Sequence, residues 1–196
     1  QGAFVQAEAT LKAVPNAGPH MSLWLQQESS VLVLDMGDPA QFGPRMKQLR
    51  EKVNQLGDPV LSCSTTAWEL WGLTNTLSHD EAWLAAEQLE HCAHATGLHY
   101  LKAFALATMG LIKSRTASSS TDMQQVLPHF DRALAALGDG NFRARRAGVE
   151  YDLGNALRRL KQYGPALEQL GRSKTRSRSI NDLAGIGAAD MSMARV

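Results

Sequence analysis

YDLGNALRRLKQYGPALEQLG, residues 151–171, predicts a helix, a tight turn and a second helix. On both sides of the turn, apolar residues recur at spacings of three and four, which is typical of amphipathic helices. The two stripes are Leu153, Ala156, Leu157 and Leu160, then Ala166, Leu167 and Leu170. Pro165 lacks an amide hydrogen and has a fixed φ, so it suits the first turn of the second helix. The stretch therefore predicts an antiparallel helical hairpin.

Small side chains lie where the two helices of this hairpin would cross, at Gly154 and Ala166. A glycine followed twelve residues later by an alanine matches the small positions of the tetratricopeptide pattern. Leu153 and Leu170 match it too, whereas Ser173 replaces its last small residue. Further matches to second-helix positions of the pattern are Val126, Phe130 and Ala133. The segment from 126 to 171 therefore resembles a tetratricopeptide repeat.

Similar landmarks recur along the whole chain. Glycines predicted to end a second helix fall at 57, 97 and 138, and glycines inside a first helix fall at 72, 110 and 154. Ala194 continues the second series, and Phe42-Gly43-Pro44 recurs as Tyr163-Gly164-Pro165. The period of about 40 residues exceeds the usual tetratricopeptide length of about 34. We expect an all-α fold of about ten helices, paired in chain order.

The chain as a whole resembles the long-helix, tetratricopeptide-like (TPR-like) arrays of large bacterial regulators. Such arrays form a right-handed superhelix of antiparallel helix pairs, in which the first helix of each pair lines the concave face. They are similar to N-terminal portions of bacterial signalling proteins, including diguanylate cyclases with a GGDEF domain. The resemblance implies a sensor or regulatory module that acts on an output domain.

Turn and cap residues set the expected helix bounds. Ser78 and Glu81 form a predicted capping box that starts the fifth helix. Thr121 with Gln124 is the predicted cap of the seventh helix, and Pro128 should kink that helix or mark its true start. The expected helices are 3–14, 20–36, 41–56, 60–77, 79–94, 99–114, 121–137, 142–161, 164–178 and one from about 182 onward.

Length and composition, with 44% apolar and 20% charged residues, suit one or two soluble domains with a real core. The resemblance implies a single TPR-like domain over residues 1–196. The first residue is Gln1, and Val196 falls inside an amphipathic pattern, so we expect a segment excised from a longer protein. No signal peptide or membrane span is visible. Cys63 and Cys92 lie in apolar helical contexts, which predicts buried free thiols in a reducing, cytoplasmic setting.

Charge is uneven along the chain. Residues 1–100 carry five Lys/Arg and eleven Asp/Glu (5 − 11 = −6), and residues 101–196 carry fifteen and eight (15 − 8 = +7), which sums to the net +1. The basic half, with dense arginines at 143–146 and 158–161 and a basic run at 172–178, suggests nucleic-acid binding as one alternative. Stacking aromatics and a helix-turn-helix pattern are missing there, so nucleic acid is the less favoured partner.

Catalytic and metal motifs are not recognisable. The sequence offers no phosphate loop after a strand, no nucleophile elbow and no paired carboxylates, so we expect no enzyme activity and no cofactor within this segment. His91 and His94 share a predicted helix face, and Cys92 and His99 are close in sequence. No paired motif supplies further ligands, so helix-terminal histidines are favoured over a metal site.

The concave face is the predicted partner-binding surface. The resemblance places on it Phe104, Leu111, Arg115, Tyr151, Asn155, Arg158 and Arg159. Such Arg, Asn and Tyr side chains would hold a protein or peptide through its backbone or a carboxylate. Two further hypotheses are a small-molecule sensor with an apolar pocket around Trp68 and Trp71, and a homodimer formed through an exposed terminal helix pair.

Overall fold

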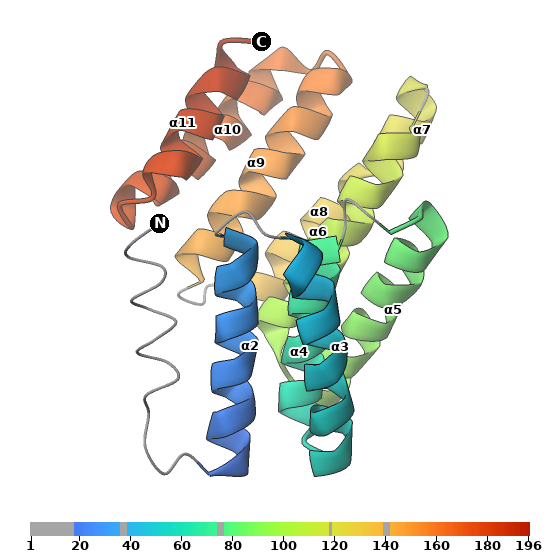
Figure 1. Cartoon of the computed structure of the whole chain (residues 1–196). Coiled ribbons are helices and arrows are strands. Elements are labelled where there is room, and N and C mark those ends of the chain that lie inside the picture. The colour runs from blue at the N-terminus through green and yellow to red at the C-terminus, as the bar shows by residue number, and fades with distance from the viewer. Residues whose placement is uncertain (1–17, 36–38, 74–76, 118, 139–141) are drawn as a thin grey trace. The chain divides into compact units, whose positions relative to one another are not determined.

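The structure, a computed structural model, describes residues 18–35, 39–73, 77–117, 119–138 and 142–196 (Figure 1). All regular elements in these ranges are α-helices. They are α2 (Pro19–Asp35), α3 (Pro39–Leu56), α4 (Pro59–Leu73), α5 (His79–Thr96), α6 (His99–Thr116), α7 (Ser120–Gln124), α8 (Leu127–Leu137), α9 (Arg143–Arg159), α10 (Tyr163–Ser179) and α11 (Leu183–Met193). The chain divides into two compact units, 1–85 and 86–196, which are described separately.

The predicted helices from 20 onward are confirmed, mostly to within two residues. The seventh helix is broken in two, and the last helix ends at Met193 instead of continuing to Val196. The predicted end of the fourth helix, at 77, follows residues 74–76, which lie outside the described ranges. The helix expected over 3–14 lies outside the described residues. A single domain over 1–196 stays a prediction.

In unit 1, α3 packs against both α2 and α4, and α2 also contacts α4. The buried side chains of α3 are Phe42, Met46, Leu49 and Val53. Their spacing of three and four residues puts them on one helix face. Leu23 of α2 and Leu61 of α4 complete the apolar cluster, and Trp68 packs at its edge.

A neutral polar contact also ties α2 to α4 in unit 1. Gln27 is only 1% exposed. Its Nε2 donates to Ser64 Oγ at 3.0 Å, and its Oε1 accepts from Thr65 Oγ1 at 3.1 Å. Both polar ends of the buried amide are therefore used, which removes the cost of an unpaired buried group.

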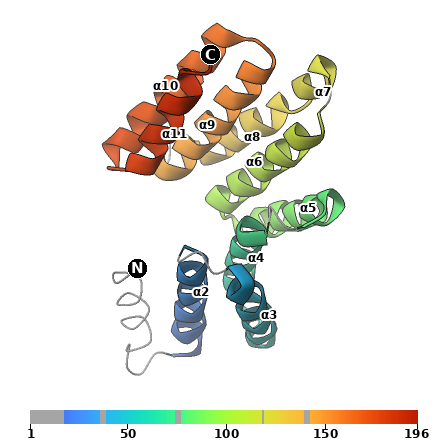
Figure 2. The same ribbon diagram turned by 45° about the horizontal axis from the view of Figure 1, so that its top comes forward.

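Unit 2 repeats helix pairs in chain order (Figure 1, Figure 2). The pairs are α6 with α8 and α9 with α10, and α11 packs against α10. The first helices also contact one another, α6 with α9 and α9 with α11. This neighbour pattern is the one expected for stacked two-helix repeats.

Interior glycines let the helices of a pair approach closely. A Cβ added at Gly110 would lie 2.9 Å from the ring of Phe130, and one at Gly154 would lie 2.7 Å from Leu170. Both partners belong to the following second helix. Gly72 of α4 is more crowded than either, but its neighbour is Phe42 of the preceding helix α3. The glycine series thus marks tight crossings, with different partners in the two units.

The three glycines predicted to end second helices are confirmed. Gly57, Gly97 and Gly138 all have positive φ, at 72°, 70° and 51°. Glycine adopts this left-handed conformation without a Cβ penalty, so it commonly terminates α-helices.

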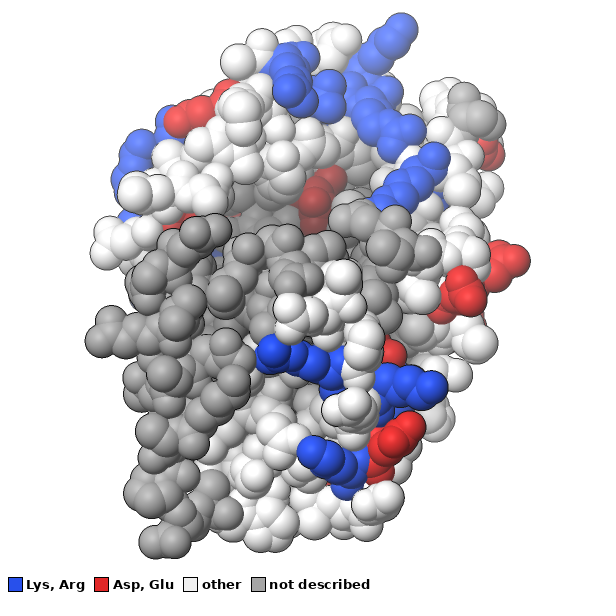
Figure 3. Space-filling view, in the orientation of Figure 1, with Lys and Arg blue, Asp and Glu red and all other residues white. Residues whose placement is uncertain are grey.

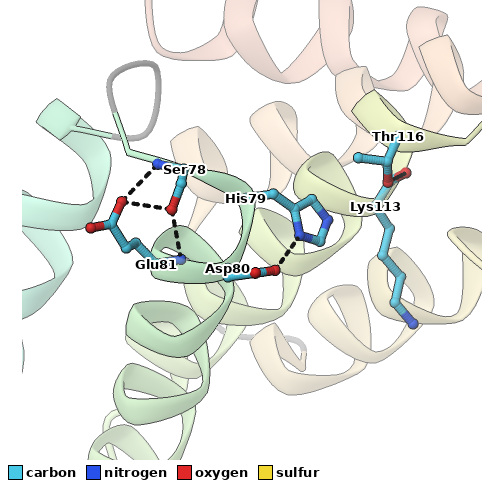
Figure 4. A network of polar contacts seen from close by, with 6 residues as sticks. All are labelled: Ser78, His79, Asp80, Glu81, Lys113 and Thr116. Atoms are coloured by element: carbon cyan, nitrogen blue, oxygen red, sulfur yellow. Dashed lines mark hydrogen bonds and ion pairs between the residues drawn. The ribbon is translucent and has the colours of Figure 1, made fainter.

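The capping box predicted at the start of α5 is confirmed (Figure 4). The Ser78 amide donates to Glu81 Oε2 at 2.9 Å, and the Glu81 amide donates to Ser78 Oγ at 3.3 Å. The Ser78 hydroxyl and amide also lower the pKa of the Glu81 carboxyl, because they bond to its charged form.

The cap predicted for the seventh helix was wrong. Ser119 and Asp122, not Thr121 and Gln124, form the capping box of α7. Pro128 lies in the first turn of α8, which confirms the expected break at this residue. A proline fits there because first-turn amides have no partner within the helix.

The expectation of free thiols was also wrong. Both cysteines of the chain are described, and both Cys63 and Cys92 are disulfide-bonded. Cys63 is fully buried in α4, and Cys92 is half-buried in α5. Disulfides persist mainly in oxidising environments, so the cysteines no longer support a reducing compartment.

Candidate partner-binding face

The first helices of unit 2 carry all seven predicted partner-binding residues. Leu111, Tyr151, Asn155 and Arg158 are half-buried, Arg115 and Arg159 are exposed, and Phe104 is buried. We call the surface that these seven residues form on α6 and α9 the first-helix face. Side-chain contacts link α6 to α9 and α9 to α11.

Aromatic and charged groups pack together where α6 and α9 begin. The guanidinium of Arg145 lies 4.4 Å from the centre of the Phe104 ring, within the range of a cation–π contact. Phe104 is only 7% exposed, so it forms the floor under Arg145. Nearby, the rings of Tyr100 and Phe142 stack with centroids 6.2 Å apart.

Asp152 is a half-buried carboxylate on α9 that the sequence analysis did not single out. Burial raises its pKa to about 7, because the charged form loses hydration, and the positive charge of Arg145 opposes this rise. Burial also lowers the pKa of the Arg145 guanidinium. Tyr100 and Asp152 oppose this shift, because their negative charges favour the protonated guanidinium. The spacing of seven residues between Arg145 and Asp152 was the available signal, since it places both on one helix face.

Tyr151 and Asn155 lie one turn apart on α9. The Tyr151 hydroxyl accepts a hydrogen bond from Ser192 Oγ at 3.3 Å, which links α9 to α11. Asn155 Nδ2 donates to the Tyr151 carbonyl at 3.1 Å. Both side chains are thus oriented by the chain while remaining half accessible.

Arg159 contacts the carboxyl end of α6. Its guanidinium donates to the carbonyls of Ser114 and Ala117, the latter at 3.3 Å. Carbonyls in the last turn of a helix have no partner within the helix, so Arg159 caps α6 from α9. Arg158 differs, since its Nε is buried and has no hydrogen-bond partner among the described residues. Figure 3 shows basic side chains gathered over the end of the molecule where Figure 1 draws the end of α9.

The basic run of α10 is largely neutralised by carboxylates. Arg172 pairs with Glu168, and Lys174 pairs with Asp190, each at 2.5 Å. Arg176 Nε donates to both oxygens of the buried Glu150 at 2.9 and 2.8 Å. Nucleic acids bind to proteins mainly through Lys and Arg side chains that neutralise their phosphates. Because these cations of α10 already pair with carboxylates, they weigh against a nucleic-acid surface on α10.

The tryptophan pair of α4 is partly open to solvent. Trp68 and Trp71 meet edge to face with ring centroids 5.6 Å apart, and Trp71 is 42% exposed. Two grooves of unit 1 are lined chiefly by polar side chains. The apolar-pocket hypothesis around Trp68 and Trp71 therefore gains no support from these grooves.

Within the described ranges, no three His, Cys, Asp or Glu side chains converge on a point where they could hold a metal ion. These ranges include His91, Cys92, His94 and His99. None of the described helices combines the length and apolarity that a bilayer crossing requires.

Comparison with known proteins supports the fold. No protein-family model matches the chain, and no curated protein matches it. Aspartyl phosphate phosphatase F from Bacillus subtilis is similar in structure, with a TM-score of 0.72 and 14% identity over 96% of this chain and 48% of its own. A Rap protein complexed with competence and sporulation factor gives a TM-score of 0.76 and 14% identity, over 95% of this chain and 50% of its own.

A third similar structure comes from Pyrococcus horikoshii. It is a signal transduction ATPase of the STAND class with a tetratricopeptide repeat sensor, at a TM-score of 0.68 and 15% identity over 97% of this chain and 30% of its own. This chain thus spans half or less of the length of each of these structures. At such low identity the likeness shows the fold alone, and the fold is all-α and TPR-like, as the sequence predicted.

Proposed function

We propose that the chain is a regulatory module that binds a protein or peptide through the first-helix face of unit 2. The observation that carries the proposal is a polar row on α9. Tyr151, Asp152, Asn155 and Arg158 are all half-buried, whereas Leu153, Gly154, Ala156 and Leu157 between them are buried. A row of oriented, accessible donors and acceptors fits the main-chain groups of an extended peptide.

The similar structures support this reading by analogy. One is a Rap protein captured with competence and sporulation factor, and another contains a tetratricopeptide repeat described as a sensor. Ligand binding by a fold of this type is therefore precedented. The residues that would bind here are those of this chain, with Phe104 and Leu111 as the apolar floor and Arg115, Arg158 and Arg159 as the basic end.

Selection from a displayed random peptide library, with the purified chain as bait, tests the proposal. The double substitution Tyr151→Ala with Asn155→Ala should weaken the selected peptides about tenfold or more, because it removes oriented polar contacts. Tyr163→Ala, at an exposed tyrosine of α10, is the matched control and should leave binding unchanged. Peptides that bind the double variant as tightly as the unsubstituted chain would contradict the proposal.

The proposal also includes an output domain, whose activity the module would regulate. We expect an output domain beyond Val196, and a diguanylate cyclase is the case suggested by the TPR-like resemblance. The sequence of the full gene product beyond Val196 checks this directly. A catalytic domain of another kind there would leave the proposed regulatory role standing and would rule out the diguanylate cyclase.

Homodimerisation is proposed through α11. Leu183 is 79% exposed and Met191 is 61% exposed on this helix, and exposed apolar side chains favour association. Light scattering across a range of protein concentrations should show a dimer that Leu183→Glu with Met191→Glu disrupts. A monomer at every concentration would remove this part of the proposal.

Cytoplasmic location also stays a proposal, and the bonded cysteines weigh against it, because cytosolic disulfides are rare. Thiol titration of the protein isolated from its native cells under alkylating conditions decides the matter. Two free thiols per chain would support the cytoplasm, and none would indicate an oxidising compartment.

A further inference from the structure

Gly148 lies in the interior of α9, where packing gives no reason for a glycine. In a helix interior, glycine costs about 1 kcal/mol relative to alanine. At Gly110 and Gly154 the close approach of a second helix explains the residue. Gly148 is exposed instead, and among the described residues no neighbour lies within 4 Å of an added Cβ. The missing side chain therefore leaves open surface on α9, one turn from Tyr151 of the first-helix face.

Charged side chains flank this opening. Arg145 precedes Gly148 by three residues and Asp152 follows it by four, so all three share one side of α9. An open glycine alone marks no site, since Gly171 of α10 has equally open surroundings. The flanking pair is what distinguishes Gly148.

The guanidinium of Arg145 has hydrogen-bond donors to offer. It lies 4.4 Å from the centre of the Phe104 ring, and the negative face of the ring attracts it. Such a contact does not use up the five N–H donors of a guanidinium. Within the described part of the chain, no residue accepts a hydrogen bond from Arg145, and its attraction to Asp152 acts across a distance.

The carboxylate of Asp152 is the acceptor on the other side of Gly148. Burial raises its pKa, yet no described residue donates a hydrogen bond to it, and Arg145 acts on it through charge alone. Most buried polar side chains have at least one hydrogen-bond partner. The charges of Arg145 and Asp152 sum to zero, so a cation or an anion would be attracted by one of them and repelled by the other.

A neutral group that carries a donor next to an acceptor suits this pair best, and an amide is such a group. A guanidinium only donates and a carboxylate only accepts. The carbonyl oxygen of an amide would therefore face Arg145, and its N–H would face Asp152. Because Gly148 has no Cβ, the amide can approach the helix surface closely.

We infer that Arg145 and Asp152 bind one amide group of the partner peptide across Gly148. The inference rests on the proposed function and names the group that this part of α9 recognises. That group is either a main-chain peptide bond or the carboxamide of an Asn or Gln side chain.

Peptides selected from the displayed random library, with the purified chain as bait, are the probes for this inference. Gly148→Leu should weaken their binding about tenfold or more, because the leucine side chain would occupy the opening. Gly171→Leu is the matched control, since it fills an equally open position on α10 and should leave binding unchanged. Circular dichroism should show intact helices in both variants.

The charged pair is tested with the same peptides. Arg145→Met and Asp152→Ala should each weaken binding about tenfold, because each removes a charge-assisted hydrogen bond. Arg143→Met, at an exposed arginine of the same helix, controls for charge and should have no effect.

Two changes in a selected peptide locate the bound amide. Loss of affinity on N-methylation of one peptide bond assigns the main chain, and loss on replacement of an Asn or Gln by Leu assigns a carboxamide. In Arg145→Met the sensitive position should lose most of its effect, because groups in contact are energetically coupled. A peptide in which no amide is sensitive, or one that needs a charged side chain in its place, would overturn the inference.

Failure of this inference differs from failure of the proposed function. Peptides that bind Gly148→Leu as tightly as the unsubstituted chain, yet are weakened by Tyr151→Ala with Asn155→Ala, would overturn the amide site alone. A library that yields no binding peptide would remove the proposed function and the amide site together.

Discussion

Each unit has a buried polar contact that ties its helices together, and the two contacts differ in chemistry, although unit 1 also has a more exposed ion pair between Arg50 and Glu69. In unit 1 the tie between α2 and α4 is neutral, with the Gln27 amide bonded to Ser64 and Thr65. In unit 2 the tie between α9 and α10 is ionic, with Arg176 on the buried Glu150, and Arg159 of α9 makes a charge-assisted bond to the end of α6. A lost neutral bond costs little, whereas a buried charge without its partner is expensive. These contacts should therefore differ in their sensitivity to substitution.

The largest effect is expected for Arg176→Met. It leaves the Glu150 carboxylate buried without its cation, which should lower the free energy of unfolding by about 3 kcal/mol in urea titrations. Gln27→Leu in unit 1 should cost about 1 kcal/mol or less, because the single hydrogen of the Thr65 hydroxyl can bond to the Leu61 carbonyl at 2.8 Å in place of Gln27. The exposed Arg178→Met controls for charge on α10. A larger loss for Gln27→Leu than for Arg176→Met would break the comparison.

The next largest effects are expected for glycine substitutions, which compare the tight helix crossings of the two units. Gly72→Ala should cost about 2 kcal/mol, since its Cβ would overlap the fully buried ring of Phe42. Gly154→Ala meets Leu170 at 2.7 Å and should cost about 1 kcal/mol, because the helix propensity of alanine offsets part of the strain. Thermal unfolding measures both effects.

Gly171→Ala is the control for these glycines. No atom lies within 4 Å of its added Cβ, so alanine should stabilise α10 by about 0.5 to 1 kcal/mol. Stabilisation by Gly72→Ala of the same size would show that Phe42 moves aside and that the crossing in unit 1 is loose.

A smaller effect depends on pH and belongs to unit 2. The folded chain holds the Asp152 proton up to a pKa of about 7, above the ordinary value of 3.8. The folded state therefore binds more protons between these values, and its stability falls as pH rises from about 4 to about 7. Asp152→Asn should remove this loss of stability. At pH 8 the variant should therefore have a free energy of unfolding about 1 kcal/mol higher than that of the unsubstituted chain, after allowance for solvent screening.

Melting curves at pH 4 and pH 8 measure the Asp152 effect. The variant and the unsubstituted chain should melt alike at pH 4 and diverge at pH 8, with the variant more stable. Asp131→Asn, at an exposed position of α8, serves as the control. A variant that is less stable at pH 8 would mean that attraction to Arg145 outweighs burial.

The smallest effect is expected for Arg159→Met. It removes the donors to the carbonyls of Ser114 and Ala117, which should cost about 0.5 to 1 kcal/mol. Hydrogen exchange should show faster opening of the last turn of α6. Arg143→Met, an exposed arginine at the start of the same helix, should leave that turn unchanged.

The candidate face was predicted only in part. The repeat pattern assigned Tyr151, Asn155 and Arg159 to first-helix positions, because helix periodicity fixes which residues share a face. It did not identify Asp152, whose raised pKa depends on burial and on Arg145. It also did not predict the bonds of Arg159 to the end of α6, and the partner role of this arginine stays a proposal. Periodicity carries no information about which through-space contacts a long side chain makes.

Sequence alone determined the helices and the repeat, because their signals are local. The glycines at 57, 97 and 138 end helices through their own backbone freedom, and Ser78 with Glu81 starts one within four residues. Only the tertiary structure decided that Phe42 fills the space at Gly72, that the basic run of α10 is paired, and that both cysteines are bonded. These outcomes depend on residues far apart in the chain, whose approach is set by packing.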